Sequence, residues 1–488
     1  METPNIVFLV LDAVRADHVG CYGYDRETTP NIDAIADSAV RYTNAFSPSI
    51  WTPTVHAAIF TGTYPSHSGI HGTALGIRED LETLPETLQA AGYRTFAASA
   101  GAHIRQDRGY DRGIDEYVET RRITPDLGSL RKVLTDRSFA KQVVFSLNAG
   151  PDDKSLYKFD RFERFASRCA SDGDPFFGFV NVKTAHSPFN PPRPYKELFC
   201  KDLERPRWEA IERALGALGR QPQSIRGFDD EDIRRVAHSG GDEVMAGEID
   251  LDEAEWDVVE AWYDGAIRYL DERVGSFVER LRSLGVYEDT LLVITADHGD
   301  NFGDHGLTGH SFSLYDSLLH VPLVVSPPGA ESPGRTVDNQ VSLLDLHPTF
   351  LEVAGETPPE NEFATSLVPF DDRQFHEYTF AEYAGYEAPK SRLERKYPNM
   401  DTAHLARTLQ AVRDDEYKLV VGSDGTAELY AWRDDPGETT DLSEAEPDVV
   451  EALRDVLEES LAELRTDADL EVPEDPDLQA QLEHLGYR

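Results

Sequence analysis

The sequence predicts an α/β fold: a doubly wound sheet with helices on both faces, and a small α+β subdomain at the C-terminal end. Two observations predict the sheet. Continuous apolar runs recur along the chain, as in strands that are buried on both faces of a parallel sheet. Amphipathic helical stretches alternate with these runs. A third observation predicts the subdomain, because the alternation gives way to short strands and one helix after residue 360. We therefore expect a main domain over residues 1–360 and a C-terminal subdomain and tail over 361–488.

The individual elements follow in chain order. Strands are predicted at residues 5–12, 95–100, 176–182, 291–295 and 321–326. Helices are predicted at 30–41, 83–91 and 251–284, and Gly285 ends the last of them. Two polar, charged stretches, at about 119–170 and 200–255, are predicted to be helical insertions over one face. In the C-terminal part, residues 411–421 and 427–432 predict a hairpin around Ser423-Asp424-Gly425, and 447–464 predict a helix.

The charge of the chain is extreme. Among 488 residues, 90 Asp and Glu stand against 47 Lys and Arg, which gives a net charge of −43. Such a chain is not expected to bind a nucleic-acid backbone or an anionic membrane. Either the acid forms a surface adapted to high salt, or it binds a dedicated partner. Because the acidic residues are spread over the whole sequence, we favour adaptation to salt and a halophilic source.

Several classes of protein are excluded by composition. Hydrophobic residues make up 40% of the chain, enough for a large core. The three cysteines, Cys21, Cys169 and Cys200, cannot form a disulfide framework, and their spacing is not that of a zinc site. No stretch approaches the ~18 apolar residues of a membrane span, and Asp12 interrupts the N-terminal apolar run, so a signal peptide is not expected. These observations predict a soluble, cytoplasmic protein.

Two predicted strands end in acidic residues. Asp12 closes the first strand, and Asp297-His298 follow the strand at 291–295. Ligands of open α/β sheets bind beyond the carboxyl ends of the strands. Each acid taken alone is more often a loop or capping residue, but two strand-end acids with a histidine favour a metal site.

A hydroxyl and a histidine are predicted at the start of one helix. Pro53 fits a first helical position, which would make Thr52 the N-cap, and His56 lies four residues further along the same helix face. Free N–H groups and the positive end of the helix dipole favour an anion there. Thr52 is therefore either a simple cap or part of an anion-binding active site.

At this point the sequence resembles the sulfatase family, within the alkaline phosphatase superfamily. The resemblance rests on motifs that occur in the family's order over residues 4 to about 465, outside the two predicted insertions. They are Arg15-Ala16-Asp17-His18, Gly20-Cys21-Tyr22-Gly23, Thr29-Pro30-Asn31-Ile32-Asp33, Thr61-Gly62-Thr63-Tyr64-Pro65, Gly92-Tyr93-Arg94-Thr95, Thr295-Ala296-Asp297-His298-Gly299-Asp300, Gly303-Asp304-His305-Gly306, Leu344-Asp345-Leu346-His347-Pro348-Thr349 and Glu428-Leu429-Tyr430. The resemblance implies an alkaline-phosphatase-like sheet and an ester hydrolase.

The resemblance also implies roles for single residues. Asp12, Asp297 and His298 match the family's metal ligands, and Thr52 matches its nucleophile, which also contacts the metal. His56 falls at the basic residue that follows the nucleophile. Three further histidines match active-site positions: His186 in the middle of the chain, His310 where many members have a lysine near the leaving group, and His103, with weaker flanks, as a substrate-binding residue.

The positions at which the sequence departs from the family pattern are as informative about the chemistry as the positions that match it. Sulfatases oxidise a Cys or Ser nucleophile to formylglycine, which Thr52 cannot form, so Thr52 itself is expected to attack, as in phosphodiesterase-like branches. Asp12-Ala13 replaces the family's acidic pair, and His298 replaces an asparagine. These changes predict one divalent ion, with Mn²⁺ or Zn²⁺ favoured over Ca²⁺ or Mg²⁺.

The combined prediction is a metal-dependent hydrolase of phosphate or sulfate esters that acts on a small-molecule or glycan ester. Three alternatives share parts of this pattern. A transferase would pass the group to an alcohol instead of water, a phosphomutase would need a second metal cluster, and a binding protein would have lost part of the site. The sequence sets neither the alcohol part of the substrate nor the oligomeric state.

Overall fold

The computed structural model describes residues 3–71, 74–99, 104–120, 135–149, 153–192, 194–202, 241–329, 334–384, 387–398, 400, 402, 405, 407–462 and 464. Residues 121–134 and 203–240, which belong to the two predicted insertions, lie outside the described residues, as does the tail from 465.

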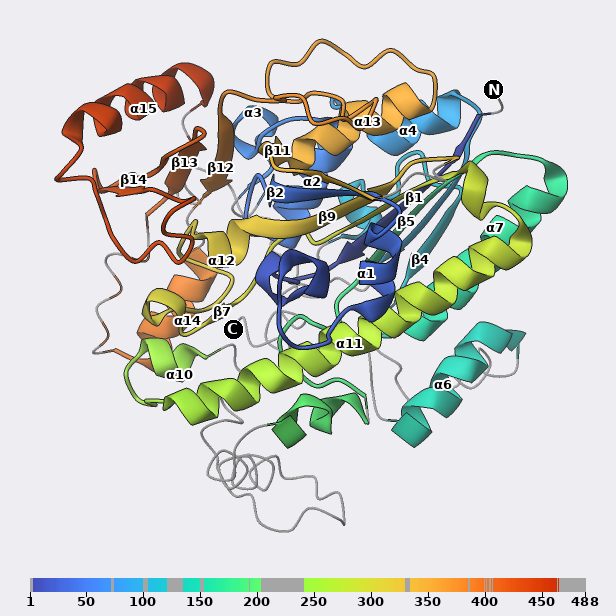
Figure 1. The fold of residues 1–488 in the computed structure, drawn as a ribbon, viewed down its shortest axis with the longest axis horizontal. Helices are drawn as coiled ribbons and strands as arrows, with labels where there is room; N and C mark the ends of the chain where they lie inside the picture. The colour runs from blue at the N-terminus through green and yellow to red at the C-terminus, as the bar shows by residue number, and fades with distance from the viewer. Residues whose placement is uncertain are drawn as a thin grey trace.

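The main domain is built on one sheet in which the predicted α/β fold is confirmed (Figure 1). The strands lie in the order β10-β2-β9-β6-β1-β5-β3-β4, and β11 also pairs with β2. At the centre, β1 runs parallel to β5 and β6, whereas β9 is antiparallel to both β2 and β6. The bounds of the strands are β1 Asn5–Leu11, β2 Val40–Phe46, β3 Arg94–Ser99, β4 Glu116–Glu119, β5 Phe176–Val182, β6 Thr290–Thr295, β9 His320–Ser326, β10 Arg335–Val337 and β11 Val341–Ser342.

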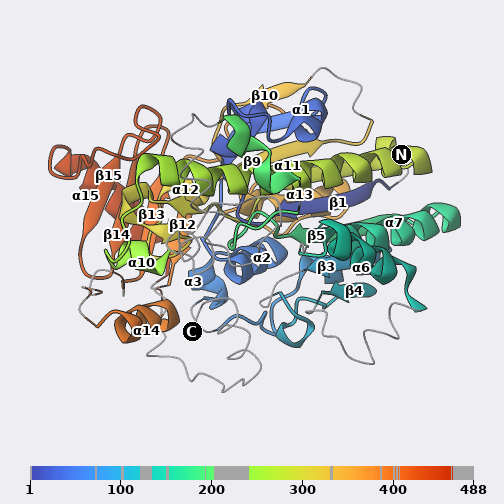
Figure 2. The same ribbon diagram turned by 90° about the horizontal axis from the view of Figure 1, so that it is seen from below.

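Helices cover both faces of this sheet (Figures 1 and 2). On one face, α11 (Glu253–Leu284) packs against α1 (Pro30–Ala36) and α7 (Ser155–Asp172). On the other face, α2 (Thr52–Thr61), α4 (Leu84–Ala90) and α13 (Leu346–Val353) contact one another. The remaining described helices are α3 Pro65–Ser68, α6 Arg137–Ala149, α10 Asp242–Met245, α12 Asp316–Leu319, α14 Glu387–Lys396 and α15 Pro447–Ser460.

Short-range chemistry explains the long helix α11. Asp252 accepts a hydrogen bond from the Glu255 N–H at 2.9 Å, and the Glu255 carboxylate accepts one from the Asp252 N–H at 2.9 Å. Gly285 ends the helix in the left-handed conformation, with φ of 71°. The apolar stripe of the helix is buried, as its spacing predicts.

Aromatic side chains fill the layer between α7 and the sheet. Phe162 stacks on Phe96 of β3, with ring centroids 5.0 Å apart, and both rings are fully buried. A Cβ at Gly178 of β5 would lie 1.9 Å from the Phe162 ring, so only glycine lets the helix approach this closely. This part of the range predicted as an insertion therefore packs directly on the sheet.

Two sequence predictions differ from the structure. Residues 30–41 do not form one helix, because α1 ends at Ala36 and Val40 begins β2, which pairs with β9. Residues 411–421 are not one strand either: β13 (Leu409–Arg413) and β14 (Lys418–Gly422) are separated by a turn that Asp414 caps. In both places a turn without Gly or Pro joins two elements, so the chain gave little sign of a break.

A second, antiparallel sheet packs beside the first. Its order is β12-β13-β14-β15, with β12 at Thr379–Tyr383 and β15 at Ala427–Tyr430. Leu453 and Leu457 of α15 pack on it. Ser49, just before α2, bridges to Glu382 of β12 and donates its hydroxyl to the Glu382 main-chain carbonyl at 2.8 Å. The second sheet thus contacts the segment that carries Thr52.

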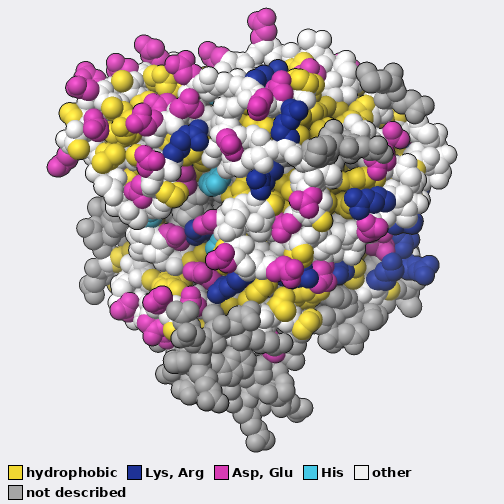
Figure 3. Space-filling view, in the orientation of Figure 1, with side chains coloured by type: hydrophobic (Ala, Val, Ile, Leu, Met, Phe, Trp, Pro, Cys, Tyr) yellow, Lys and Arg dark blue, Asp and Glu magenta, His cyan; other side chains and the backbone are white. Residues whose placement is uncertain are grey.

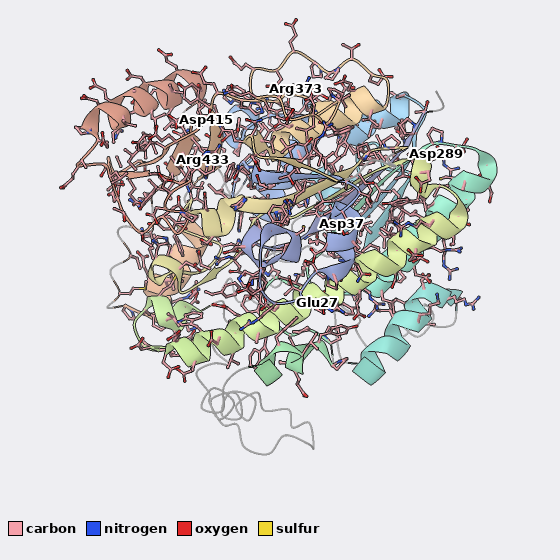
Figure 4. The ribbon with its side chains drawn as sticks, viewed as in Figure 1. Glu27, Asp37, Asp289, Arg373, Asp415 and Arg433 are labelled. Carbon is pink, nitrogen blue, oxygen red and sulfur yellow. The ribbon has the colours of Figure 1, made fainter. Side chains whose placement is uncertain are left out.

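Acidic side chains are scattered over the surface. Figure 3 shows many more Asp and Glu than Lys and Arg side chains on this face, without a single acidic cluster. Figure 4 labels some exposed acids, which come from distant parts of the chain: Glu27, Asp37, Asp289 and Asp415.

Candidate metal centre and active site

The two strand-end acids and His298 meet at the carboxyl edge of the sheet. Asp12 follows β1, and Asp297 follows the adjacent parallel strand β6 after one residue. One ligand atom from each of Asp12, Asp297 and His298 lies within 4.8 Å of the others, and all three side chains are buried. The topology therefore brings together residues that are nearly 300 positions apart in the chain.

Two oxygens of this cluster lack hydrogen-bond partners. Asp12 Oδ1 and Asp297 Oδ2 are both fully buried and accept no hydrogen bond. The other Asp297 oxygen accepts the Ala13 N–H at 3.2 Å, and Ala13 holds a left-handed φ of 64° that aims this N–H. Buried carboxylate oxygens are costly unless they are paired or bind a metal. The donor set of two carboxylates and one imidazole therefore fits a divalent cation.

The electrostatics of the cluster also favour a cation. Burial and repulsion from Asp297 raise the pKa of the Asp12 carboxyl to about 7. Burial opposes a charge on His298, yet Asp297 and Asp12 attract it so strongly that the pKa of its imidazole is raised. His298 donates Nδ1–H to the Gly299 carbonyl at 2.8 Å, which leaves Nε2 facing the carboxylates. A metal-ligating histidine is commonly oriented in this way.

Thr52 lies next to this cluster, at the start of α2. Its Oγ1 is 3.2 Å from His298 Nε2, and the side chain is 7% exposed. Thr52 was predicted to be the helix N-cap, but Trp51 has the extended N-cap conformation and Thr52 is the first helical residue. The Thr52 hydroxyl contacts His298 and not a backbone N–H of α2. It points to the metal-ligand cluster instead of its own helix.

His56 lies on α2, one turn after Thr52. The side chain is completely buried, Nδ1 donates to the Thr52 carbonyl at 2.7 Å, and the ring packs edge-on against Phe179. Burial lowers the pKa of the His56 imidazole, and Asp297 opposes this shift. The place of His56 beneath Thr52, with Nδ1 3.9 Å from Asp297 Oδ2, suits a positioning residue.

His186 and His310 form a hydrogen-bonded pair beside His298. Their Nε2 atoms are 3.1 Å apart, and the His310 ring stacks on the His298 ring with centroids 4.3 Å apart. His186 Nδ1 is 2.7 Å from the Ser187 carbonyl, and His310 Nδ1 is 3.2 Å from the Ile50 carbonyl. Carbonyl oxygens only accept, so each Nδ1 carries a hydrogen.

This geometry sets the proton count of the pair. Two Nε2 atoms in contact need one hydrogen between them, so the pair holds three N–H hydrogens and one positive charge. Burial lowers the pKa of His186 to about 3, so this ring disfavours the positive charge. His310 stands at the position where the resemblance implies a lysine.

Two further residues at the site carried no signal in the sequence. Asn181 of β5 donates Nδ2–H to Asp12 Oδ2 at 3.3 Å and is completely buried. The Lys183 charge acts on both Asp12 and His186, where it favours the ionised carboxylate and disfavours a charged imidazole. The sequence of a buried strand does not indicate which of its residues will lie beside the last residue of the neighbouring strand. His103 lies outside the described residues, so its predicted role has no structural counterpart here.

Comparisons with known proteins agree with the fold and the motifs. The sulfatase family matches residues 4–356, and the C-terminal region of N-sulphoglucosamine sulphohydrolase matches residues 303–467. The chain therefore belongs to the sulfatase family, a class of ester hydrolases. Among the described residues, no helix is long and apolar enough to cross a bilayer.

Individual relatives are distant. The chain is 24% identical to an uncharacterized sulfatase, YidJ, of Escherichia coli over 91% of this chain and 83% of that protein. It is 22% identical to an N-acetylglucosamine-6-O-sulfatase of Bacteroides thetaiotaomicron, over 90% and 83% of the two chains. A crystal structure of a phosphonate monoester hydrolase of Agrobacterium radiobacter shares the fold, with a TM-score of 0.68, 20% identity and coverage of 98% and 96%.

Proposed function

We propose that this protein is a metal-dependent hydrolase of phosphate or sulfate esters in which unmodified Thr52 is the nucleophile. The observation that carries the proposal is the position of the Thr52 hydroxyl, 3.2 Å from His298 Nε2 and beside two buried, unpartnered carboxylate oxygens. A threonine that served only as a helix cap would accept a hydrogen bond from a backbone N–H of its helix, whereas the Thr52 hydroxyl contacts His298.

Asp12, Asp297 and His298 would hold one divalent ion, together with the Thr52 oxygen. Such an ion lowers the pKa of a bound hydroxyl and polarises an ester oxygen. The mixed carboxylate and imidazole donors favour Mn²⁺ or Zn²⁺, and Asn181 fixes the orientation of Asp12.

The chain's own residues supply the remaining steps. The Thr52 hydroxyl releases its proton to water, and Oγ1 attacks phosphorus or sulfur in line with the ester oxygen. A bond between Oγ1 and phosphorus or sulfur forms while the ester bond to the alcohol breaks. His310 Nε2, which carries the shared proton, donates it to the departing alkoxide, and His186 then stands ready to receive a proton. Water hydrolyses the Thr52 ester and restores the hydroxyl. Because water can resolve a phosphothreonine, a phosphate mono- or diester is the favoured substrate and a sulfate ester the second.

A substrate panel with a covalent readout tests this function. Aryl phosphate monoesters, diesters, phosphonates and sulfates are assayed with Mn²⁺ or Zn²⁺ in molar salt, and the protein is quenched during turnover. We expect hydrolysis of at least one class and a transient adduct on the peptide that contains Thr52. Its mass should be about 80 Da from a phosphate monoester or a sulfate, and that of the phosphoryl group with its remaining substituent from a diester or a phosphonate. Hydrolysis without an adduct on that peptide, or no hydrolysis of any ester with metal bound, would contradict the proposal.

The His186–His310 pair offers a separate check within the same assay. His310→Gln keeps a donor and an acceptor but cannot carry the extra proton. We expect it to slow esters with poor leaving groups by about 10²–10⁴-fold and to spare those with an activated aryl leaving group, which need no general acid. Equal losses on both kinds of ester would assign His310 to another role.

A further inference from the structure

A buried ion pair lies where α7 packs beside β5 (Figure 2). Lys158 of α7 is 0% exposed, and its Nζ lies 2.5 Å from Oδ2 of Asp153, whose side chain is 4% exposed. Burial opposes a charge on the Asp153 carboxyl, but attraction to the Lys158 ammonium lowers its pKa. Both residues belong to the range predicted as an insertion, so the sequence gave them no role at the site.

Three hydrogen bonds tie this ion pair to the carboxyl end of β5. Lys158 Nζ donates to the Asn181 main-chain carbonyl at 2.8 Å. Asp153 accepts the Lys183 N–H at Oδ2 and the Thr184 hydroxyl at Oδ1, both at 2.8 Å. The ion pair therefore holds the chain on both sides of the last residue of β5.

The segment held in this way carries two parts of the candidate active site. Asn181 Nδ2 donates to Asp12 Oδ2 at 3.3 Å, and the Asp12 N–H donates to the Val182 carbonyl at 2.8 Å. The His186 N–H donates to the Lys183 carbonyl at 3.1 Å, in the turn that leads to the histidine pair. A shift of this segment would therefore move the support of a metal ligand and one histidine of the pair together.

Apolar packing alone would not need these charges. Phe162, one turn further along α7, fills the same layer by stacking on Phe96. Replacement of a buried ion pair by apolar side chains of similar volume is often neutral or stabilising, because two buried charges lose their hydration. Hydrogen bonds to a carbonyl, an N–H and a hydroxyl are directional, whereas apolar contacts are not, so they fix where a segment lies and how it is turned.

We infer that Asp153 and Lys158 are positioning residues for the metal centre and for the histidine pair; this inference rests on the proposed function. Lys158 holds the strand so that Asn181 meets Asp12, and Asp153 holds the turn that presents His186. Because the partners that orient a ligand influence metal affinity, loss of the ion pair should weaken binding of the metal as well as proton transfer at the histidine pair.

Metal affinity tests the inference without turnover. The probe is Mn²⁺ or Zn²⁺, whichever binds wild type more tightly, titrated calorimetrically into the full-length protein. Lys158→Met keeps the length of the side chain but removes the ammonium from the Asn181 carbonyl, and Asp153→Asn removes its counter-charge. We expect each variant to bind the metal about tenfold more weakly, the lower end of what the loss of a partner around a ligand costs.

Asp160→Asn is the matched control. Asp160 lies two residues after Lys158 and therefore on the opposite side of α7, toward α6. It resembles Asp153 in its surroundings, because its side chain is 10% exposed, pairs with Lys141 and accepts the Ser138 hydroxyl. The variant removes the same kind of carboxylate from the same helix but leaves the contacts with β5 in place, so the metal affinity should not change.

The double variant Lys158→Met/Asp153→Asn keeps the test decisive if a single variant does not fold. It leaves neither charge of the pair buried without its partner, which is the main cost of breaking a buried ion pair. Because the two residues act together, we expect it to bind the metal about as weakly as either single variant, and not weaker by both losses combined. Metal affinity that is unchanged in the double variant, or equally reduced in Asp160→Asn, would overturn the inference.

The histidine pair gives a second readout. With saturating metal, the ion-pair variants should lose about tenfold or more in kcat on esters with poor leaving groups, and less on activated aryl esters, which need no general acid. A purely structural role would lower Tm and the folded fraction, and it would reduce both rates equally. Equal losses on both kinds of ester would therefore overturn the part of the inference that concerns His186.

Failure of this inference and failure of the proposed function give different results. If the ion-pair variants weaken metal binding but wild type hydrolyses no ester, the positioning of the metal centre stands and the proposed function is wrong. If wild type hydrolyses an ester and the ion-pair variants match it in metal affinity and kcat/KM, the proposed function stands and the inference is wrong. If wild type binds neither ion, both are wrong.

Discussion

Replacement of Thr52 by alanine should separate catalysis from stability. The change removes a hydroxyl that contacts His298 at 3.2 Å and one methyl group from a side chain that is 7% exposed. A neutral hydrogen bond contributes about 1 kcal/mol and a buried methyl about 0.8 kcal/mol, so the free energy of unfolding should fall by only about 2 kcal/mol. Because the hydroxyl caps no helix, no capping energy is lost.

The loss of activity should be far larger. Removal of a nucleophile that acts through a covalent intermediate costs roughly 10⁴–10⁶ in rate, or about 5–8 kcal/mol of transition-state stabilisation. Thr52→Ser keeps the hydroxyl and should retain activity within about tenfold. Thr52→Val keeps the shape of the side chain and should be as inactive as Thr52→Ala.

The assay pairs ester hydrolysis in excess metal with a thermal melt of each variant. We expect Tm to change by a few degrees across the three variants, whereas activity follows only the presence of the hydroxyl. Wild-type activity in Thr52→Val would refute the reasoning, because it would show that the hydroxyl beside His298 takes no part in the reaction. A collapse of Tm in Thr52→Val with activity in proportion to the folded fraction would assign Thr52 a structural role.

Three further predictions concern the metal, pH and salt. Asn181→Ala removes the hydrogen bond to Asp12 and should weaken binding of Mn²⁺ or Zn²⁺ by about 10–100-fold in a calorimetric titration. Unchanged affinity would show that metal binding does not depend on the hydrogen bond from Asn181 to Asp12. Burial raises the pKa of Glu382 to about 7, so the folded state holds a proton that the unfolded state releases near pH 4.5. The free energy of unfolding should therefore fall by up to about 3 kcal/mol as pH rises from 4.5 to 7. Glu382→Gln should flatten this slope in urea titrations at several pH values. If the charge of −43 is an adaptation to salt, Tm should fall as salt is lowered from molar to about 0.1 M, where the Debye length reaches ~10 Å; a Tm that does not depend on salt would instead favour a dedicated acidic binding surface.

The local elements were largely predictable because their signals are local. The strands at 176–182 and 291–295 differ from β5 and β6 by one residue at most, and Gly285 marks the end of α11 correctly. Strand β2 had no such signal, since Val40, Tyr42 and Ala45 are buried among polar residues on a strand that its pairing with β9 stabilises. Pairing partners more than 200 positions away are not visible in a short window of sequence.

The chemistry-bearing residues were predictable as candidates but not in their roles. Asp12, Asp297 and His298 were expected together, since parallel strands place their carboxyl ends at one edge of a sheet. His56 was expected to stabilise the charge on the transferred group, and this role stays a prediction. Its actual place depends on the packing of α2 against Phe179, which no spacing along the helix reveals.

The sequence by itself determined the fold class, the family and the residue types that meet at the strand ends, because these depend on periodicity and on motifs that are contiguous in the chain. Only the tertiary structure decided which oxygens lack partners and that the Nε2 atoms of His186 and His310 lie within hydrogen-bond distance of each other. These properties arise from distances between atoms of segments far apart in the chain, and hydrogen bonding and desolvation change within an ångström or two. They are fixed by packing, which a linear sequence does not display.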